Sequence, residues 1–342
     1  MHMPDSLLNG AEQALQQSFR KILSFNGLLM SAAVLAAYRP MHALPDRRAR
    51  PDVVVPVRYD PVSLPAPRAP LVLAGAWVMR ADDPRFGGIS SLTFERGRFL
   101  AVSDLGAVVS FDPPSAHLPK ARLQDLTIGP GPFGKKWTRD AESLAGDPLG
   151  RGWWVGYEQH HSLWLYDHDF KRALAAIDLH QSGWRDNRGA EGLLPKQGTL
   201  LVIAENGRDA IEVRPHGIKR ADLKVGADVA DAARAPDGSD WLLLRTKSLK
   251  GLSQSIAPLL KDGAGYRAGP PWPLPKGSFD NYEGLAIAPL PNGGWRFWLV
   301  TDDGHRVMAR TLLVALDLSA PPGKRKARRQ APGSKNSAVE KP

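Results

Sequence analysis

The feature that most constrains the fold is a hairpin pattern that recurs along the chain. Each copy has an acid, a short apolar run, a turn rich in Gly and Pro, and a second apolar run that ends in another acid. The clearest copies are "RDAESLAGDPLGRGWWVGYEQ", "RGAEGLLPKQGTLLVIAENG" and "NYEGLAIAPLPNGGWRFWLVTDDG". Repeats spaced by roughly 40 to 50 residues indicate an array of similar supersecondary units.

Two further stretches are degraded copies of the same pattern. In "GISSLTFERGRFLAVSDLG" Ser90 stands in place of the first acid, and in "DVADAARAPDGSDWLLLRTKS" Arg245 stands in place of the last. We align the five copies on Leu92, Leu144, Leu193, Ala233 and Leu285. In this alignment Asp231 occupies the position of the first acid in the fourth copy.

The units are predicted to be blades of a propeller. Two more strand-like runs follow in several copies, for example "SLWLYD" and "KRALAAIDL". Four short strands per unit without a helical pattern are typical of a propeller blade. The sequence therefore predicts an all-β fold, a β-propeller of four-stranded blades, with five units counted and six as the alternative. The last unit lacks a fourth strand after "LLVALDL", so we expect the N-terminal run 71–79 to complete it and close the ring.

The two ends of the chain differ from this pattern. Arg20 and Lys21 precede 17 uncharged, mostly apolar residues, 22–38, which are typical of a signal peptide or of a retained membrane anchor. An ordinary buried helix is the alternative. The predicted division is a signal or anchor segment and leader over 1–50, a Pro-rich extended linker over 51–70, a β-propeller domain over 71–319 and a disordered basic tail over 320–342. We expect a periplasmic protein, or one anchored in the membrane and facing the periplasm.

Composition excludes several classes of site. The formal net charge of +10 comes mainly from the C-terminal tail, and the body has no nucleic-acid module, so we expect no nucleic-acid partner and a monomer. The absence of cysteine excludes disulfides, thiolate metal sites and a cysteine nucleophile. There is no G-x-S-x-G, H-E-x-x-H or P-loop motif.

The repeated acids are expected to converge. The start of the first strand and the end of the second lie at one edge of an antiparallel hairpin, and the first strand of every blade lines the central channel. The acids predicted to meet at one channel mouth are Glu142, Glu158, Glu191, Glu205, Glu283, Asp302 and Asp303. So many like charges need a compensating cation, and oxygen ligands of this kind suit Ca²⁺. The alternative is that each acid accepts backbone N–H bonds at a blade turn.

Two arginines and two histidines are candidates for catalysis. Arg139 and Arg188 each stand three residues before a channel glutamate, and their planar fork of donors suits phosphate or carboxylate. His160 and His305 follow the second-strand acids and are candidates for general acid or base. Ordinary surface histidines are the alternative.

The chain resembles the phytase-like family described as "esterase-like activity of phytase". The resemblance rests on "DDPRFGGISSL", "RDAESLAG", "NRGAEGLLP", "NYEGLAIAP" with "WLVTDDG", and the closing "LLVALDL", and it covers roughly residues 71–318. The family is similar in layout to calcium-dependent propeller phytases, which hydrolyse phosphomonoesters at an acidic channel, and its members are mostly exported bacterial proteins. Ser90 and Arg245 depart from the acidic pattern, so fewer metal positions are expected.

Three functions stay open at this point. The resemblance implies an exported, Ca²⁺-assisted hydrolase of phosphate or carboxylic esters with a small anionic or ester substrate. A lactonase-like propeller would need one metal ion and a neutral substrate. A non-enzymatic envelope propeller would bind a ligand in the channel.

Overall fold

A computed structural model describes residues 48–319, apart from 181–183, 185–188, 249–250, 278–279, 292 and 305–308. The predicted signal or anchor segment, including residues 22–38, and the basic tail 320–342 lie outside the described residues. Within the described part, no helix is long and apolar enough to span a bilayer.

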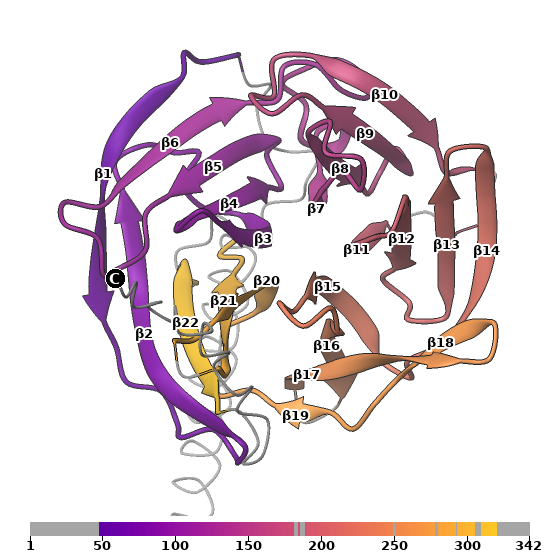
Figure 1. The fold of residues 1–342 in the computed structure, drawn as a ribbon. Helices are drawn as coiled ribbons and strands as arrows, with labels where there is room; N and C mark the ends of the chain where they lie inside the picture. The colour runs from indigo at the N-terminus through magenta and orange to yellow at the C-terminus, as the bar shows by residue number, and fades with distance from the viewer. Residues whose placement is uncertain are drawn as a thin grey trace, which may run out of the picture.

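The strands form five antiparallel blades (Figure 1). Blade I contains β3 (Ile89–Glu95), β4 (Arg98–Ser103), β5 (Ala107–Phe111) and β6 (Lys120–Asp125). Blade II contains β7 (Ala141–Gly146), β8 (Trp153–Tyr157), β9 (Ser162–Tyr166) and β10 (Ala173–Asp178), and a 3-10 turn, η2 (Lys136–Thr138), precedes it. Blade III contains β11 (Ala190–Lys196), β12 (Thr199–Ala204), β13 (Asp209–Arg214) and β14 (Gly217–Lys224). Blade IV contains β15 (Asp228–Arg234), β16 (Asp240–Ser248), β17 (Gly251–Asp262) and β18 (Gly265–Ala268), with the short β19 (Trp272–Pro273) beside β17. Blade V contains β20 (Tyr282–Pro289), β21 (Trp295–Thr301), β22 (Leu312–Leu318) and the N-terminal β2 (Leu71–Ala81).

The blades form a closed ring. The innermost strands β3, β7, β11, β15 and β20 contact one another in this order, and β20 contacts β3 (Figure 1). One hydrophobic cluster fills each of the five interfaces between neighbouring blades. Trp298 packs between blades I and V, Trp241 between IV and V, and Trp154 between II and III. The predicted all-β propeller is therefore confirmed, with five blades.

The N-terminal strand closes the ring as predicted. β2 pairs antiparallel with β22, from Leu71 opposite Leu318 to Val78 opposite Leu312. This pairing supplies the fourth strand that the last unit lacks, so the edge of blade V is covered by chain from the other end of the propeller.

The segment expected to be a linker contains an additional strand. β1 (Val53–Pro61) pairs with β6 through residues 53–56 and with β2 through residues 57–61, so it joins the outer edges of blades I and V. Its burial alternates over residues 53–57, and Val57 is buried in the cluster between these blades. This alternation lets a Pro-containing stretch form a strand at the sheet edge rather than a free linker.

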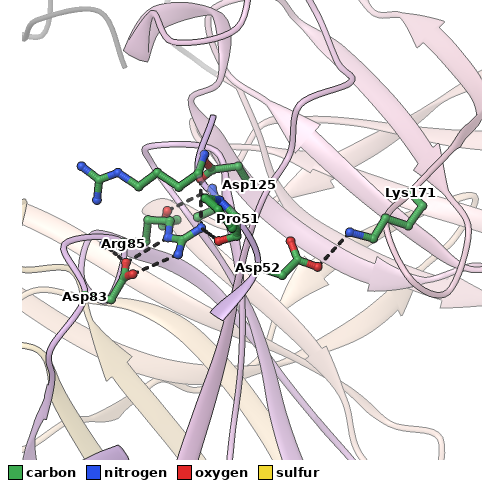
Figure 2. Close-up of polar contacts among 9 residues, drawn as sticks. Pro51, Asp52, Asp83, Arg85, Asp125 and Lys171 are labelled. Atoms are coloured by element: carbon green, nitrogen blue, oxygen red, sulfur yellow. Dashed lines mark hydrogen bonds and ion pairs between the residues drawn. The ribbon is translucent and has the colours of Figure 1, made fainter. Parts of the chain in front are cut away.

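Buried charges fix the start of this strand (Figure 2). Arg85, only 1% exposed, donates to both carboxylate oxygens of Asp83 at 2.9 Å and to the carbonyl oxygen of Pro51 at 3.1 Å. Asp125 lies 3.9 Å from the same guanidinium and accepts the backbone N–H of Arg50. Asp52 accepts from Lys171 of blade II at 2.8 Å. The chain that enters the propeller is therefore attached to both blade I and blade II.

Candidate functional site: the acidic channel mouth

Each innermost strand carries a bulge at the same place. The pairing register shifts by one residue in all five strands, and the side chain of the residue at the shift points in a different direction from those of its neighbours. The residues at the five shifts are Ser90, Glu142, Glu191, Ala230 and Glu283. The bulge therefore sets the direction of the three repeated glutamates.

The predicted alignment of the fourth copy is wrong by one residue. The bulge position there is Ala230, and Asp231 corresponds to the residue that follows each bulge, which is Ser91, Ser143, Gly192 or Gly284. Two adjacent alanines, Ala232 and Ala233, leave the register of this strand ambiguous in sequence. Asp231 is thus not a member of the mouth but of the layer below it.

Asp231 links three blades through its carboxylate. It is 1% exposed and accepts the backbone N–H groups of Leu285 at 2.7 Å, Ala232 at 2.8 Å and Leu92 at 3.3 Å, and the hydroxyl of Ser91 at 3.2 Å. The Ser91 oxygen in turn accepts the N–H of Leu144 at 3.2 Å. Burial raises the pKa of Asp231 well above its ordinary value, while the hydrogen bonds that it accepts act in the opposite direction.

The glycine after each glutamate has a packing role. A Cβ atom on Gly284 would lie 2.9 Å from the Cβ of Leu92 on the next inner strand, and one on Gly192 would lie 3.0 Å from that of Ala232. In the Glu-Gly-Leu triplet, the glutamate is therefore the bulge residue, the glycine allows the close contact between blades, and the leucine packs in the core.

A second set of residues lies at the same end of the blades, one position after the second strand in blades I, II, III and V and within β16 in blade IV. The backbone N–H of this residue donates across the hairpin in four blades, at 2.8 to 3.2 Å. The set consists of Asp104, Glu158, Glu205, Arg245 and Asp302. The structure thus brings the first-strand glutamates and the second-strand acids to one mouth of the ring.

Arg245 neutralises part of this cluster. Its guanidinium donates to Glu205 at 2.7 Å and also to Glu283, which Asn281 contacts as well. Burial lowers the pKa of Arg245, but the charges of Glu283, Glu191 and Glu205 raise it above its ordinary value. The predicted seven-acid metal set is thus divided, because two of its members are already ion-paired.

The most compact acidic group lies on blade II. Asp140, Glu142 and Glu158 can place one carboxylate oxygen each within 4.8 Å of the others, and Asp140 is 1% exposed. Three hard oxygen donors at this separation fit a Ca²⁺ ion. The prediction from sequence missed Asp140, although "RDAES" places an acid two residues before the repeated glutamate.

The remaining acids have separate surroundings. Burial raises the pKa of Glu191 well above its ordinary value, and the charges of Glu158, Glu283 and Glu205 raise it further. Burial, together with the charge of Asp104, raises the pKa of Asp302 to about 8. Asp303 accepts from the backbone N–H of Gly88 at 2.9 Å and from the hydroxyl of Thr311 at 2.7 Å, so it ties blade V to the loop before blade I.

Arg139 holds a loop instead of facing the mouth with free donors. It is 2% exposed and donates to the carbonyl oxygens of Leu126, Thr127, Pro130 and Thr138. This geometry differs from the predicted role in anion binding, since these carbonyls take most of its N–H groups. The loop between β6 and β7 is thereby fixed beside the blade II acids.

The histidine predictions have different outcomes. His160 is partly buried, and burial, His180 and Arg139 lower its pKa, so it is neutral at pH 7. A Cβ on Gly131 of the β6–β7 loop would lie 3.2 Å from its Nε2, which places His160 beside that loop. Arg188 and His305 lie outside the described residues.

Comparison with known proteins supports the family resemblance. Residues 84–243 match the model of the phytase-like family, "esterase-like activity of phytase". The resemblance is confirmed over this stretch. It contains blades I to III and the first two strands of blade IV up to Leu243. A comparison with curated proteins found no match.

Solved structures show similarity at low sequence identity. Myxococcus xanthus glutaminyl cyclase is 14% identical over 73% of this chain and 97% of its own, with a TM-score of 0.45. The Neurospora crassa Pan2 WD40 domain is 9% identical over 70% of this chain and 92% of its own, with a TM-score of 0.36. Kuenenia stuttgartiensis hydrazine synthase is 13% identical, with a TM-score of 0.37, and the matched part spans 63% of this chain and 56% of that one. No residue role below derives from these similarities.

We expect Asp231→Asn to destabilise the propeller by about 2 to 4 kcal/mol, because an amide has one acceptor oxygen whereas the carboxylate has two, which accept from Ser91 and from the backbone N–H groups of three residues. Urea unfolding measures the change. Asp237→Asn is the control, since Asp237 is exposed and uses only Oδ1 to bond Ser239. Equal stability of the two variants would contradict the bridging role.

We expect the metal-free protein to lose stability between pH 6.5 and 8. Asp302 has a folded pKa of about 8, above its unfolded value, so its proton is retained on folding and stability falls as that proton is lost. The expected loss is about 1 to 2 kcal/mol, or a few degrees in Tm. His160 has a lowered pKa, so its effect has the opposite sign and is complete below this window. Melting curves of the wild type and of Asp302→Asn should differ, with a smaller decline in the variant, in which Glu191 and Asp231 still have raised pKa values.

Proposed function

We propose that this protein is a Ca²⁺-assisted hydrolase of phosphate or carboxylic esters that acts at the acidic channel mouth. The observation that carries the proposal is the group Asp140, Glu142 and Glu158, which lies inside the stretch that matches the phytase-like family. These three carboxylates would hold the ion, and Glu191 lies close enough for its pKa to respond to Glu158. When bound, Ca²⁺ would polarise the ester oxygen and favour an attacking hydroxide.

Other residues of the chain are proposed to transfer protons and to border the substrate. His160 is neutral at pH 7 and stands two positions after Glu158, so it can accept a proton from water. Asp302, protonated at neutral pH, can donate one to a leaving group. The β6–β7 loop, fixed by Arg139, would border a substrate bound at the blade II acids. Efficient proton transfer requires pKa values near the working pH, and the pKa of Asp302, about 8, meets this condition.

A lactonase-like activity is the second candidate. Among the described residues, one group of three acids has the spacing of metal ligands. Arg245 forms ion pairs with two of the remaining glutamates, Glu205 and Glu283. One group of three acids would hold a single metal ion, which is what hydrolysis of a neutral carboxylic ester by a lactonase-like propeller requires. The comparison of a phosphate ester with a neutral ester therefore distinguishes the two candidates.

We expect Ca²⁺ to raise the melting temperature of chelator-treated protein, by the equivalent of about 2.7 kcal/mol at a hundredfold excess over Kd. Glu142→Gln and Glu191→Gln should weaken Ca²⁺ binding in calorimetry and lower hydrolysis of p-nitrophenyl phosphate or acetate together. Glu95→Gln, at an exposed turn on the other side of blade I, is the control. Hydrolysis that persists in chelator would refute the metal role. A Ca²⁺ shift without turnover of either ester would favour the binding protein.

We also propose that the protein is exported, through the segment 22–38 that follows Arg20 and Lys21. Cell fractionation with a C-terminal tag should place it in the periplasm or, if the segment is retained, in the membrane fraction. Recovery of the uncleaved protein in the soluble cytoplasm alone would refute export.

A further inference from the structure

A cavity lies between blades I and II, which are neighbours in the ring (Figure 1). Its volume is about 560 Å³, within the range of roughly 300 to 1,000 Å³ that is usual for small-molecule sites. It is bordered by the β3–β4 turn of blade I and by the β7–β8 and β9–β10 turns of blade II. The mouth residues lie at the other ends of these first and second strands, so the cavity is separate from the acidic site.

The wall that blade I contributes is polar. Alternate residues of a strand point to opposite faces of a sheet, and the face of blade I toward blade V is apolar, with Phe99, Ala101, Val109, Phe111, Ala121 and Leu123. On the face toward blade II, Val102 and Val108 join the core, but strand pairing places Leu100, Ser110 and Arg122 in the next row. Polar side chains on a face between two blades do not pack as the apolar ones do, so a space remains there.

The wall that blade II contributes is aromatic. Trp153 and Phe170 line the cavity with their ring planes 14° apart and their centroids 6.4 Å apart. Phe170 has a φ of 56°, which is uncommon for a bulky residue. Gln124 of blade I fixes this turn, because its Nε2 donates to the carbonyl oxygens of Asp169 at 2.9 Å and of Phe170 at 3.2 Å. The two walls are therefore joined by hydrogen bonds, and the cavity is preformed.

The charges that line the cavity balance. They belong to three arginines and three acids, which are Arg96, Arg98, Arg122, Glu95, Asp147 and Asp169. Three of these six are paired with residues outside the lining. Arg98 pairs with Asp112, Arg122 with Asp52 at 3.1 Å, and Asp147 with Arg151 at 2.8 Å. The lining thus has no net charge that would select an anion or a cation.

The other three charged side chains remain available to a ligand. Glu95, Arg96 and Asp169 are exposed, and their side chains form no hydrogen bond or ion pair with the part of the chain that the structure describes. The two carboxylates can accept hydrogen bonds, and the guanidinium can donate them. A ligand that both donates and accepts uses all three.

An aromatic wall opposite a mixed set of donors and acceptors matches a sugar ring. A pyranose has an apolar C–H face, which packs on an aromatic ring, and hydroxyl groups that each donate and accept. A small anion would meet the carboxylates of Glu95 and Asp169, and a wholly apolar compound would cover the guanidinium of Arg122 without replacing its hydrogen bonds to water. A neutral saccharide avoids both costs.

We propose that the cavity between blades I and II is a binding site for a neutral saccharide, with Trp153 as the stacking surface and with Arg96 and Asp169 as hydrogen-bond partners of the hydroxyl groups. The site does not rest on the proposed hydrolase function, since it shares no residue with the acidic mouth. A protein with both sites would hold a glycan on one side of the ring while the mouth on the other side remains accessible.

Calorimetric titration of the full chain in the presence of chelator tests this site. The probes are cellobiose, maltose and N,N′-diacetylchitobiose, and we expect at least one of them to bind. Asp169→Ala and Arg96→Gln should each raise the Kd of that disaccharide by about fivefold or more, because each removes a hydrogen bond to a charged group. Both side chains are exposed and unbonded within the described residues, so the melting temperature should not change. Trp153→Leu should weaken binding further.

Asp82→Ala and Arg267→Gln are the matched controls. Asp82 is exposed in the loop after β2, and Arg267 is exposed on β18, the outer strand of blade IV, so neither lines the cavity. A loss of affinity in either cavity variant, with both controls unchanged, would support the site. Binding of none of the three disaccharides, or equal affinity of the wild type and both cavity variants, would overturn it. Benzoate binding that Asp169→Ala strengthens, without binding of any disaccharide, would identify an anion site and overturn it as well.

Discussion

The closed ring depends on one buried carboxylate at its centre. Asp231 accepts backbone N–H groups from blades IV, V and I, and Ser91 extends the set to blade II. Five inner strands meet around a narrow axis, where an unpaired N–H would cost about 1 to 3 kcal/mol. One carboxylate with several acceptor sites satisfies donors that come from different blades. It therefore fixes the height at which the inner strands align, and with it the positions of the bulges above.

The same alignment produces the acidic mouth. Since every inner strand bulges one residue before the Asp231 layer, Glu142, Glu191 and Glu283 emerge at one height. Small residues below them let neighbouring strands approach, as the 2.9 Å contact predicted for a Cβ on Gly284 shows. The glycine and leucine of the repeated triplet are thus required for packing, whereas the side chain of its glutamate is available at the mouth for binding or catalysis.

The sequence was sufficient for the propeller, its closing strand and the convergence of the acids, because these follow from strand period and hairpin geometry. It was not sufficient for register and pairing. Nothing in the sequence distinguishes Ala232 from Ala233 as the core residue that follows, so Asp231 was assigned to the wrong layer. The role of Arg139 depends on carbonyl groups of a loop whose path has no sequence signature. Asp140 joins the site because its backbone carbonyl accepts the N–H of Glu158 at 3.0 Å, a pairing across the hairpin that the sequence does not show.

The mouth resolves the repulsion between its acids in three different ways. On blade IV, Arg245 neutralises Glu205 and Glu283 by ion pairs. Between blades V and I, Asp302 keeps a proton, since burial and Asp104 hold its pKa at about 8. On blade II, Asp140, Glu142 and Glu158 can place their carboxylate oxygens within 4.8 Å of one another, a spacing at which a bound metal ion would offset their mutual repulsion. A cation at blade II would lower the pKa of Glu191, whose proton is held by the charge of Glu158 and its neighbours. Binding of the ion and release of that proton are then one coupled event, and this coupling would place a negatively charged base next to the metal at the moment when the site is loaded.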